Sequence, residues 1–293
     1  MTELDPITIL SALGIFGVTS AVSISGGWDT TIWKIERGAD AYALRLFRPG
    51  QEKAARREAE TMRAASSAGV TVPEIHAQGV WQDRAVMLLS WSAGRTLMDE
   101  MRARPWAIRR LGFLFGQHQA TLHHTPYSLE EADERAWITR FAAVDDALRD
   151  RLLALNLKQD RLLHLDYHPL NVMVSERKIS CVLDWTNAMP GDPRADIART
   201  WSILRLLPLN PGRPEPVTEG ARRLLAAGWL RGYEKTAGRL QDMDLFKAWG
   251  ATAMLADLAE KLGQPGVWLE QHDLDAIETR LLRLRRRAGL PSH

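Results

Sequence analysis

The sequence predicts an α+β protein with two lobes, a small antiparallel sheet followed by a mainly helical region. Residues 21–91 are rich in β-branched and alternating apolar residues, whereas most of the chain after Gly94 places apolar residues three and four positions apart. Within this helical half, residues 161–185 return to short β-rich runs around a polar loop. We therefore expect lobes at residues 1–91 and 92–293.

The first lobe is expected to contain four strands and one helix. The strands are expected at residues 21–24, 30–36, 41–47 and 86–91, separated by glycine-containing turns. The helix is expected at residues 51–68, because this segment is rich in Ala, Glu and Arg and ends at Gly69.

The second lobe is expected to contain several amphipathic helices and one hairpin. The helices are expected at residues 106–124, 130–155, 219–237 and 243–261. The hairpin is expected from two β-rich runs at residues 171–175 and 178–183. Four prolines indicate a surface loop at residues 208–216.

The composition excludes several classes of protein. A chain of 293 residues, 45% hydrophobic and 25% charged, is typical of a globular protein rather than a disordered or fibrous one. Its one cysteine, Cys181, cannot form an intrachain disulfide, which favours a cytoplasmic location. The net charge of +2 argues against a nucleic-acid partner. The apolar stretch 7–18 is shorter than the roughly 20 residues that span a membrane, so no membrane partner is expected.

The polar loop carries the most specific pattern in the chain, His164-x-Asp166-x-x-x-x-Asn171 followed by Asp184. Asn171 stands at the start of one hairpin strand and Asp184 at the end of the other, so the hairpin would bring both to one cation. Hard oxygen ligands suit a nucleotide-bound Mg²⁺, which takes its remaining ligands from phosphates and water. Asp166 is free to accept a proton from an attacking hydroxyl. These are the parts required for phosphoryl transfer.

A metal-hydrolase site is the alternative for this loop, because His164, Asp166 and His168 could supply three ligands. That interpretation leaves Asn171 and Asp184 unexplained. Three further histidines do not share a helix face and are interpreted as core or surface residues. They are His118, His123 and His124.

On these motifs the chain resembles the aminoglycoside phosphotransferase and choline kinase-like branch of the protein kinase-like fold, over about residues 20–205. The resemblance implies a two-lobed kinase-like fold that uses ATP and Mg²⁺. It implies that Asp166 is the catalytic base and that Asn171 and Asp184 hold the metal. It also implies that Asp196 braces the catalytic loop from behind.

The first lobe would then bind the nucleotide. Gly26 and Gly27 could form a phosphate-covering loop, although a Gly-Gly turn is also a common hairpin turn. Arg45 occupies the place of the usual lysine that binds the α- and β-phosphates, and an exposed strand arginine is the alternative interpretation. Its expected carboxylate partner is Glu58, with Glu60 as the second choice.

The strand at residues 86–91 resembles the segment that crosses between lobes and presents backbone groups to adenine. Backbone atoms of Ser90 and Trp91 would make these contacts. An edge strand that enters a linker is compatible with the same residues.

The acceptor is less well determined. Residues 241–279 carry eight acidic side chains and two lysines, which would favour a cationic acceptor such as an amino sugar or amino alcohol if they faced the cleft. A solvated helix face is the alternative. Arginines in residues 280–287 are interpreted as a basic helix end rather than a nucleic-acid patch. Four aromatic residues could stack on an acceptor ring or belong to the core: Trp229, Tyr233, Trp249 and Trp268.

The sequence therefore predicts an ATP- and Mg²⁺-dependent phosphotransferase that moves the γ-phosphoryl group to a hydroxyl of a small molecule. A nucleotide-binding pseudokinase or scaffold is the alternative, favoured only by Arg45. A protein kinase is disfavoured because the interval from Asp184 to Gly191 is too short for a long activation segment. The sequence does not determine the oligomeric state.

Overall fold

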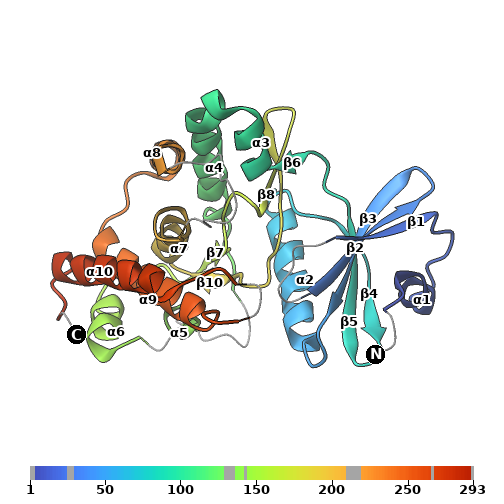
Figure 1. Ribbon diagram of the computed structural model, residues 1–293, viewed down its shortest axis with the longest axis horizontal. Coiled ribbons are helices and arrows are strands. Elements are labelled where there is room, and N and C mark those ends of the chain that lie inside the picture. The colour runs from blue at the N-terminus through green and yellow to red at the C-terminus, as the bar shows by residue number, and fades with distance from the viewer. Residues whose placement is uncertain are drawn as a thin grey trace. The chain divides into compact units, whose positions relative to one another are not determined.

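The computed structural model of the chain consists of two units (Figure 1). The first unit comprises Met1–Gly94 with Ser180–Thr186, and the second comprises Arg95–Ile179 with Asn187–His293. The structure describes residues 4–24, 30–128, 136–141, 144–208, 219–264 and 267–291. The division after Gly94 lies three residues beyond the expected one, and the return of 180–186 to the first unit was not expected.

Hydrogen bonds explain why this late segment belongs to the first unit. The Val182 amide donates to the Thr71 carbonyl at 2.9 Å. The Ser92 hydroxyl lies 3.2 Å from the Cys181 sulfur. Such pairings over a long sequence separation cannot be read from local patterns.

A five-stranded antiparallel sheet with the order β1-β2-β3-β5-β4 forms the body of the first unit. Its strands are β1 (Ser20–Ile24), β2 (Thr30–Arg37), β3 (Asp40–Phe47), β4 (Ile75–Trp81) and β5 (Arg84–Ser90). Four were expected at nearly these places. Strand β4 was missed because it lies at the sheet edge and has no fully buried residue, so its apolar signal is weak.

Two helices accompany this sheet. Helix α1 (Pro6–Ala12) begins at Asp5, whose carboxylate accepts the amides of Ile7 and Thr8 at 3.1 Å. It buries Ile9 and Leu10 in the core of the sheet. Helix α2 (Glu52–Ser67) was expected, and its buried face includes one acidic residue, Glu58.

The second unit contains mainly helices. They are α3 (Leu97–Ala103), α4 (Ile108–Leu122), α5 (Ala136–Thr139), α6 (Asp146–Leu153), α7 (Pro193–Arg205), α8 (Glu219–Ala237), α9 (Met243–Ala259) and α10 (Gln271–Arg287), with a 3₁₀ turn at Pro105–Ala107. Short strands at residues 95–191 are β6 (Arg95–Thr96), β7 (Arg161–Leu163), β8 (Val172–Ser175), β9 (Lys178–Val182) and β10 (Met189–Gly191), and β9 continues into the first unit from Ser180. β7 pairs with β10, and β6, β8 and β9 form a three-stranded sheet. The fold is thus the predicted kinase-like α+β fold, a small antiparallel sheet followed by a helical region.

The helix expected at residues 130–155 is not continuous. Helix α5 ends at Thr139, and α6 begins afresh after Asp145, whose carboxylate accepts the Leu148 amide at 3.1 Å. Aspartate favours a helix N-cap over a helix interior, which explains the interruption. The expected loop at residues 208–216 lies outside the described residues from 209 onward.

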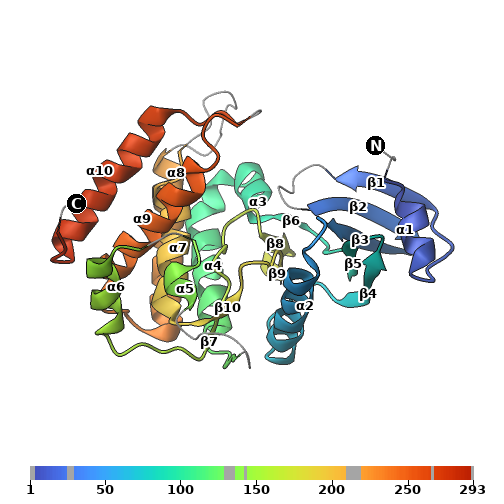
Figure 2. The same cartoon turned by 90° about the horizontal axis from the view of Figure 1, so that it is seen from below.

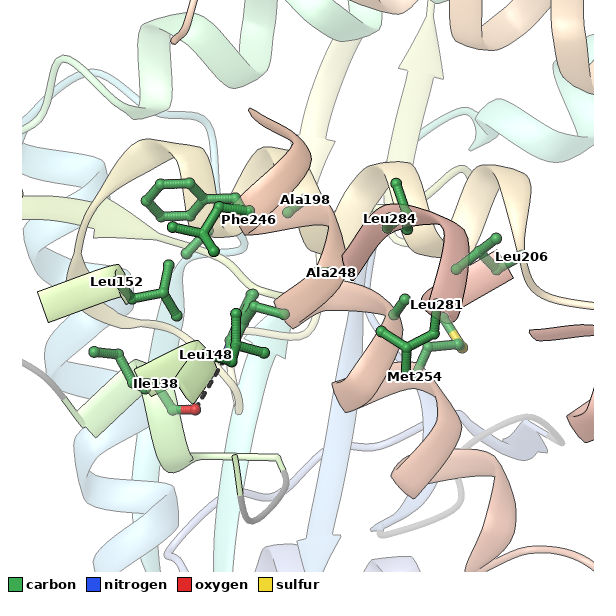
Figure 3. Packing of buried hydrophobic residues seen from close by; sticks show 14 of the residues in the cluster. Ile138, Leu148, Leu152, Ala198, Leu206, Phe246, Ala248, Met254, Leu281 and Leu284 are labelled. Atoms are coloured by element: carbon green, nitrogen blue, oxygen red, sulfur yellow. Dashed lines mark hydrogen bonds between the residues drawn. The ribbon is translucent and has the colours of Figure 1, made fainter. Parts of the chain in front are cut away.

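The main core of the second unit is built from α5, α6, α7, α9 and α10 (Figure 3). α9 packs against both α7 and α10 (Figure 2). Trp249 is buried there, and its indole nitrogen donates to the Ile138 carbonyl at 2.9 Å. Trp229 and Tyr233 are buried as well, so the acceptor-stacking interpretation is wrong for these three residues. Trp268 packs against the same core.

Helices α4 and α8 approach each other at four glycines. A Cβ on Gly112 or Gly116 would lie 2.4 or 1.9 Å from a backbone oxygen of α8, and one on Gly228 or Gly232 would lie 2.3 or 2.0 Å from a backbone oxygen of α4. The two backbones are therefore in direct contact, which only glycine permits at these positions.

Several charged side chains of residues 241–279 form ion pairs or a helix cap. Asp257 pairs with Arg199 at 2.7 Å, and Asp242 lies 3.4 Å from Arg194. Glu270 and Asp273 form a capping box at the start of α10. No helix in the described part of the chain is long and apolar enough to cross a membrane.

Candidate active site

The loop between β7 and β8 carries the predicted catalytic residues of the second unit. Leu165 adopts a positive φ of 61°, and its amide donates to the Asp196 carboxylate at 2.5 Å. The Asn171 amide donates to the His168 carbonyl at 2.9 Å. These two hydrogen bonds fix the backbone of the loop on both sides of Asp166.

Asp166 is held by two neighbours on the same loop. Its Oδ2 accepts from Asn171 Nδ2 at 3.1 Å, and its Oδ1 lies 3.5 Å from His168 Nε2. Burial alone would raise the pKa of Asp166, but the hydrogen bond and charge of His168, with the charges of His164 and Arg199, lower this pKa to about 2. Asp166 is therefore an oriented carboxylate at neutral pH.

Asn171 directs its amide nitrogen at Asp166, where Nδ2 also donates to the Asp166 carbonyl at 3.1 Å. Its amide oxygen has no hydrogen-bond partner among the described residues. This leaves a hard oxygen, of the kind that Mg²⁺ prefers, next to the carboxylate.

Asp196 on α7 braces this loop from inside the second unit, as the resemblance implied. It is fully buried, and its Oδ2 accepts from His123 Nε2 at 2.8 Å and from Gln119 Nε2 at 3.1 Å. Burial alone would raise the pKa of Asp196, but the hydrogen bond and charge of His123 lower it. The carboxylate is thus ionised and bonded on both oxygens.

Two aromatic residues complete this brace. Trp229 Nε1 donates to Gln119 Oε1 at 2.7 Å, and the Tyr233 hydroxyl lies 2.9 Å from His123 Nδ1. His123 therefore lies between the Asp196 carboxylate and the Tyr233 hydroxyl. The sequence interpretation missed this role, although the spacing of Gln119 and His123 by four residues places both on one helix face.

Tyr167, next to Asp166, is tied to α4. Its hydroxyl donates to the Phe115 carbonyl at 3.0 Å, so its oxygen accepts from His118 Nδ1 at 3.3 Å. The two rings stack with centroids 6.3 Å apart. Burial, with a smaller effect of His164, lowers the pKa of His118 to about 4, so its imidazole is neutral at pH 7.

This neutral histidine makes stability depend on pH. Below its unfolded pKa of 6.5 the unfolded chain binds a proton that folded His118 does not, so stability rises with pH between about 4 and 6.5. Lowering the pH from about 7.5 to about 5 should cost the wild-type protein about 2 kcal/mol of unfolding free energy through His118. We expect His118→Gln to lose this much less stability over the same pH range. Urea unfolding at the two pH values measures this, with the exposed His272→Gln as control. An unchanged pH dependence in His118→Gln would contradict it.

In the first unit, Arg45 and Glu58 form a buried ion pair. Arg45 Nη1 donates to Glu58 Oε1 at 2.6 Å, and the two residues are 8% and 2% exposed. Glu60 is exposed on the other side of α2, so Glu58 is the partner. The interpretation of Arg45 as an exposed strand arginine is wrong. Its Nε is buried and has no partner among the described residues.

Asp184 lies two residues beyond the end of β9, in the same unit. It has a φ of 58°, and its side chain is 47% exposed. Its Oδ1 lies 3.9 Å from Arg45 Nη2. The next amide, of Trp185, donates to Glu58 Oε1 at 3.2 Å. The structure thus groups Arg45, Glu58 and Asp184 in the first unit.

Hydrogen bonds of the sheet limit which backbone groups of Ser90 and Trp91 could contact adenine. The Ser90 amide donates to the Glu74 carbonyl at 2.8 Å, and the Trp91 amide donates to the Ala41 carbonyl at 3.0 Å. Neither amide is available to a base, which leaves carbonyl groups of this segment. The other expected nucleotide residues, Gly26 and Gly27, lie outside the described residues.

The alternative of a hydrolase metal cluster is not supported. His164 is buried, and its Nδ1 accepts the Asp166 amide at 3.3 Å. The described residues contain no group of three or more His, Cys, Asp or Glu side chains that could hold a metal ion.

The fold and this loop define a protein of the kinase-like branch that contains the aminoglycoside phosphotransferases. The model of the phosphotransferase enzyme family matches residues 20–239. The chain belongs to this family. It matches no curated protein sequence.

Solved structures share the fold over nearly the whole chain. A thermostable variant of the aminoglycoside phosphotransferase APH(4)-Ia, in ternary complex with AMP-PNP and hygromycin B, is 16% identical with a TM-score of 0.67, covering 96% of this chain and 97% of its own. Spectinomycin phosphotransferase APH(9)-Ia, in complex with ADP and spectinomycin, is 12% identical with a TM-score of 0.57, covering 98% and 94%. A putative fructosamine-3-kinase from Haemophilus somnus 129PT is 15% identical with a TM-score of 0.59, covering 92% and 96%.

Proposed function

We propose that the protein transfers the γ-phosphoryl group of ATP, in the presence of Mg²⁺, to a hydroxyl group of a small molecule. The observation that carries this proposal is the ionised Asp166, held by His168 and Asn171 on a loop that Asp196 braces. A rigid carboxylate of this kind accepts the proton of an attacking hydroxyl without reorganisation.

The residues present fit a magnesium ion. Asp184 offers a half-exposed carboxylate, and Asn171 offers an amide oxygen without a partner among the described residues. We propose that these two residues hold Mg²⁺. The ion would neutralise charge on the donor phosphates.

The residues of the first unit fit a nucleotide phosphate. Arg45 carries a buried Nε donor without a partner among the described residues, and Glu58 holds its guanidinium in place. We propose that Arg45 binds the α- and β-phosphates and that Gly26 and Gly27 cover them. Complexes of the structural neighbours with AMP-PNP and ADP support nucleotide binding.

A small-molecule acceptor is supported by the neighbours that bind hygromycin B and spectinomycin. A cationic acceptor was expected from residues 241–279. Several of these carboxylates are engaged in ion pairs and a helix cap, which weakens that argument. The pseudokinase alternative is also weakened, because Arg45 makes the buried pair with Glu58 that the lysine of an active kinase would make.

A coupled ADP-release screen tests the proposal. The panel contains amino sugars, amino alcohols, simple sugars and homoserine, each with ATP and Mg²⁺ and with EDTA as control. We expect at least one acceptor to raise ADP release about tenfold over the acceptor-free rate, corresponding to about 1.4 kcal/mol of barrier. Binding of ATP with Mg²⁺ but no stimulation by any acceptor would favour the scaffold instead.

A further inference from the structure

The hydroxyl of Thr186 lies between two carboxylates of the first unit. Its Oγ1 is 2.9 Å from Asp184 Oδ1 and 3.0 Å from Glu58 Oε2. Glu58 is already bonded through its other oxygen, which accepts from Arg45 at 2.6 Å and from the Trp185 amide at 3.2 Å. Thr186 is therefore the link between the Arg45–Glu58 pair and Asp184.

The two carboxylates must share the single hydrogen of the Thr186 hydroxyl. A threonine hydroxyl has one hydrogen to donate, and the nearby oxygens of Asp184 and Glu58 both compete for it. The hydroxyl can therefore satisfy Asp184 or Glu58 fully, but not both at once. Arg45 Nη2, at 3.9 Å from Asp184, is too distant to replace this hydrogen bond.

We propose that Thr186 is a positioning residue that orients Asp184 for the metal ion. With no cation at Asp184, its hydroxyl holds the Asp184 carboxylate and separates it from Glu58. When a divalent cation binds Asp184, the hydroxyl hydrogen turns to Glu58 and strengthens the anchor of Arg45. Metal binding at Asp184 and phosphate binding at Arg45 would thus be coupled through one side chain. The inference rests on the proposed function.

Binding of ADP, measured by calorimetry with Mg²⁺ and with EDTA, tests this role without any turnover. We expect the wild-type protein and Thr186→Ser to bind ADP more tightly with Mg²⁺. In Thr186→Val we expect this metal-dependent gain to fall about tenfold, as loss of a hydrogen bond to a charged group predicts, while metal-free ADP binding stays within about twofold. The exposed Thr71→Val in the same unit is the matched control.

The outcomes separate the inference from the proposed function. A wild-type protein that binds no ADP under either condition would overturn the proposed function and the inference with it. Metal-dependent binding in the wild type that Thr186→Val retains in full would overturn the inference alone. If Thr186→Val does not fold, Thr186→Ala takes its place, and rescue by Thr186→Ser remains the decisive comparison. A gain lost equally in Thr186→Ser would also overturn the inference.

Discussion

Replacing Asp166 by Ala is expected to lower kcat for phosphoryl transfer by about 10²-fold or more, the usual contribution of a positioned proton acceptor. Asp166 is the carboxylate that the loop holds ionised, with its pKa lowered to about 2. The proposed phosphate-binding residue, Arg45, belongs to the other unit and keeps its own partner, Glu58. We therefore expect the Kd for ADP to stay nearly unchanged. Steady-state kinetics and calorimetry on the same preparation measure both.

Two further variants sharpen this experiment. Asp166→Asn preserves the shape of the side chain and should lose activity to a similar degree, because the amide cannot accept the proton. Asp160→Asn, at an exposed position just before β7, should leave kcat unchanged. Wild-type turnover in Asp166→Ala would refute the assignment of Asp166 as the base.

Replacing Gly116 by Ala is expected to destabilise the second unit strongly. The new Cβ would lie 1.9 Å from the Trp229 carbonyl oxygen and 2.8 Å from the Tyr233 nitrogen, both backbone atoms of α8. Helices α4 and α8 would have to separate, which costs about 3 kcal/mol or more, against a gain of about 1 kcal/mol in helix propensity. A net loss of about 2 kcal/mol lowers the Tm by about 4–8 °C.

Thermal unfolding followed by circular dichroism measures this shift. Gly220→Ala is the matched control, because Gly220 is an exposed residue of α8 and the same substitution should leave the Tm unchanged or raise it. Because Trp229 and Tyr233 also brace Gln119 and His123, Gly116→Ala should reduce activity as well. A Tm equal to that of the wild type would show that the helices separate without cost.

Local sequence patterns were sufficient to predict many of the strands and helices. Strands β1, β2, β3 and β5 coincide with the β-rich runs of the first lobe, and α2 and α8 keep a helical period over their whole length. Two of the unpredicted elements were missed for different reasons. β4 lies at the sheet edge and has a weak apolar signal, whereas α7 was not expected although Asp192 as its N-cap and Pro193 in its first turn are typical of a helix start.

The candidate site likewise combines features that the sequence predicts with features that only the structure shows. The spacing of His164, Asp166 and Asn171 identified one loop because all three residues lie within eight positions of the chain. Choosing Glu58 over Glu60 required the structure, since only the packing of α2 decides which side of the helix is buried. The roles of Gln119, His123 and Thr186 also required it, because each depends on partners far away in the sequence.

By itself the sequence predicted the α+β class and one polar loop from short-range periodicity and motif spacing, and its resemblance to a family implied the kinase-like fold and the roles of the loop residues. Only the tertiary structure decided that Arg45 is buried against Glu58, that Asp196 holds the Leu165 amide, and that residues 180–186 belong to the first unit. The physical reason is that desolvation and hydrogen-bond pairing depend on which distant segments meet. Local sequence patterns do not show which distant segments pair.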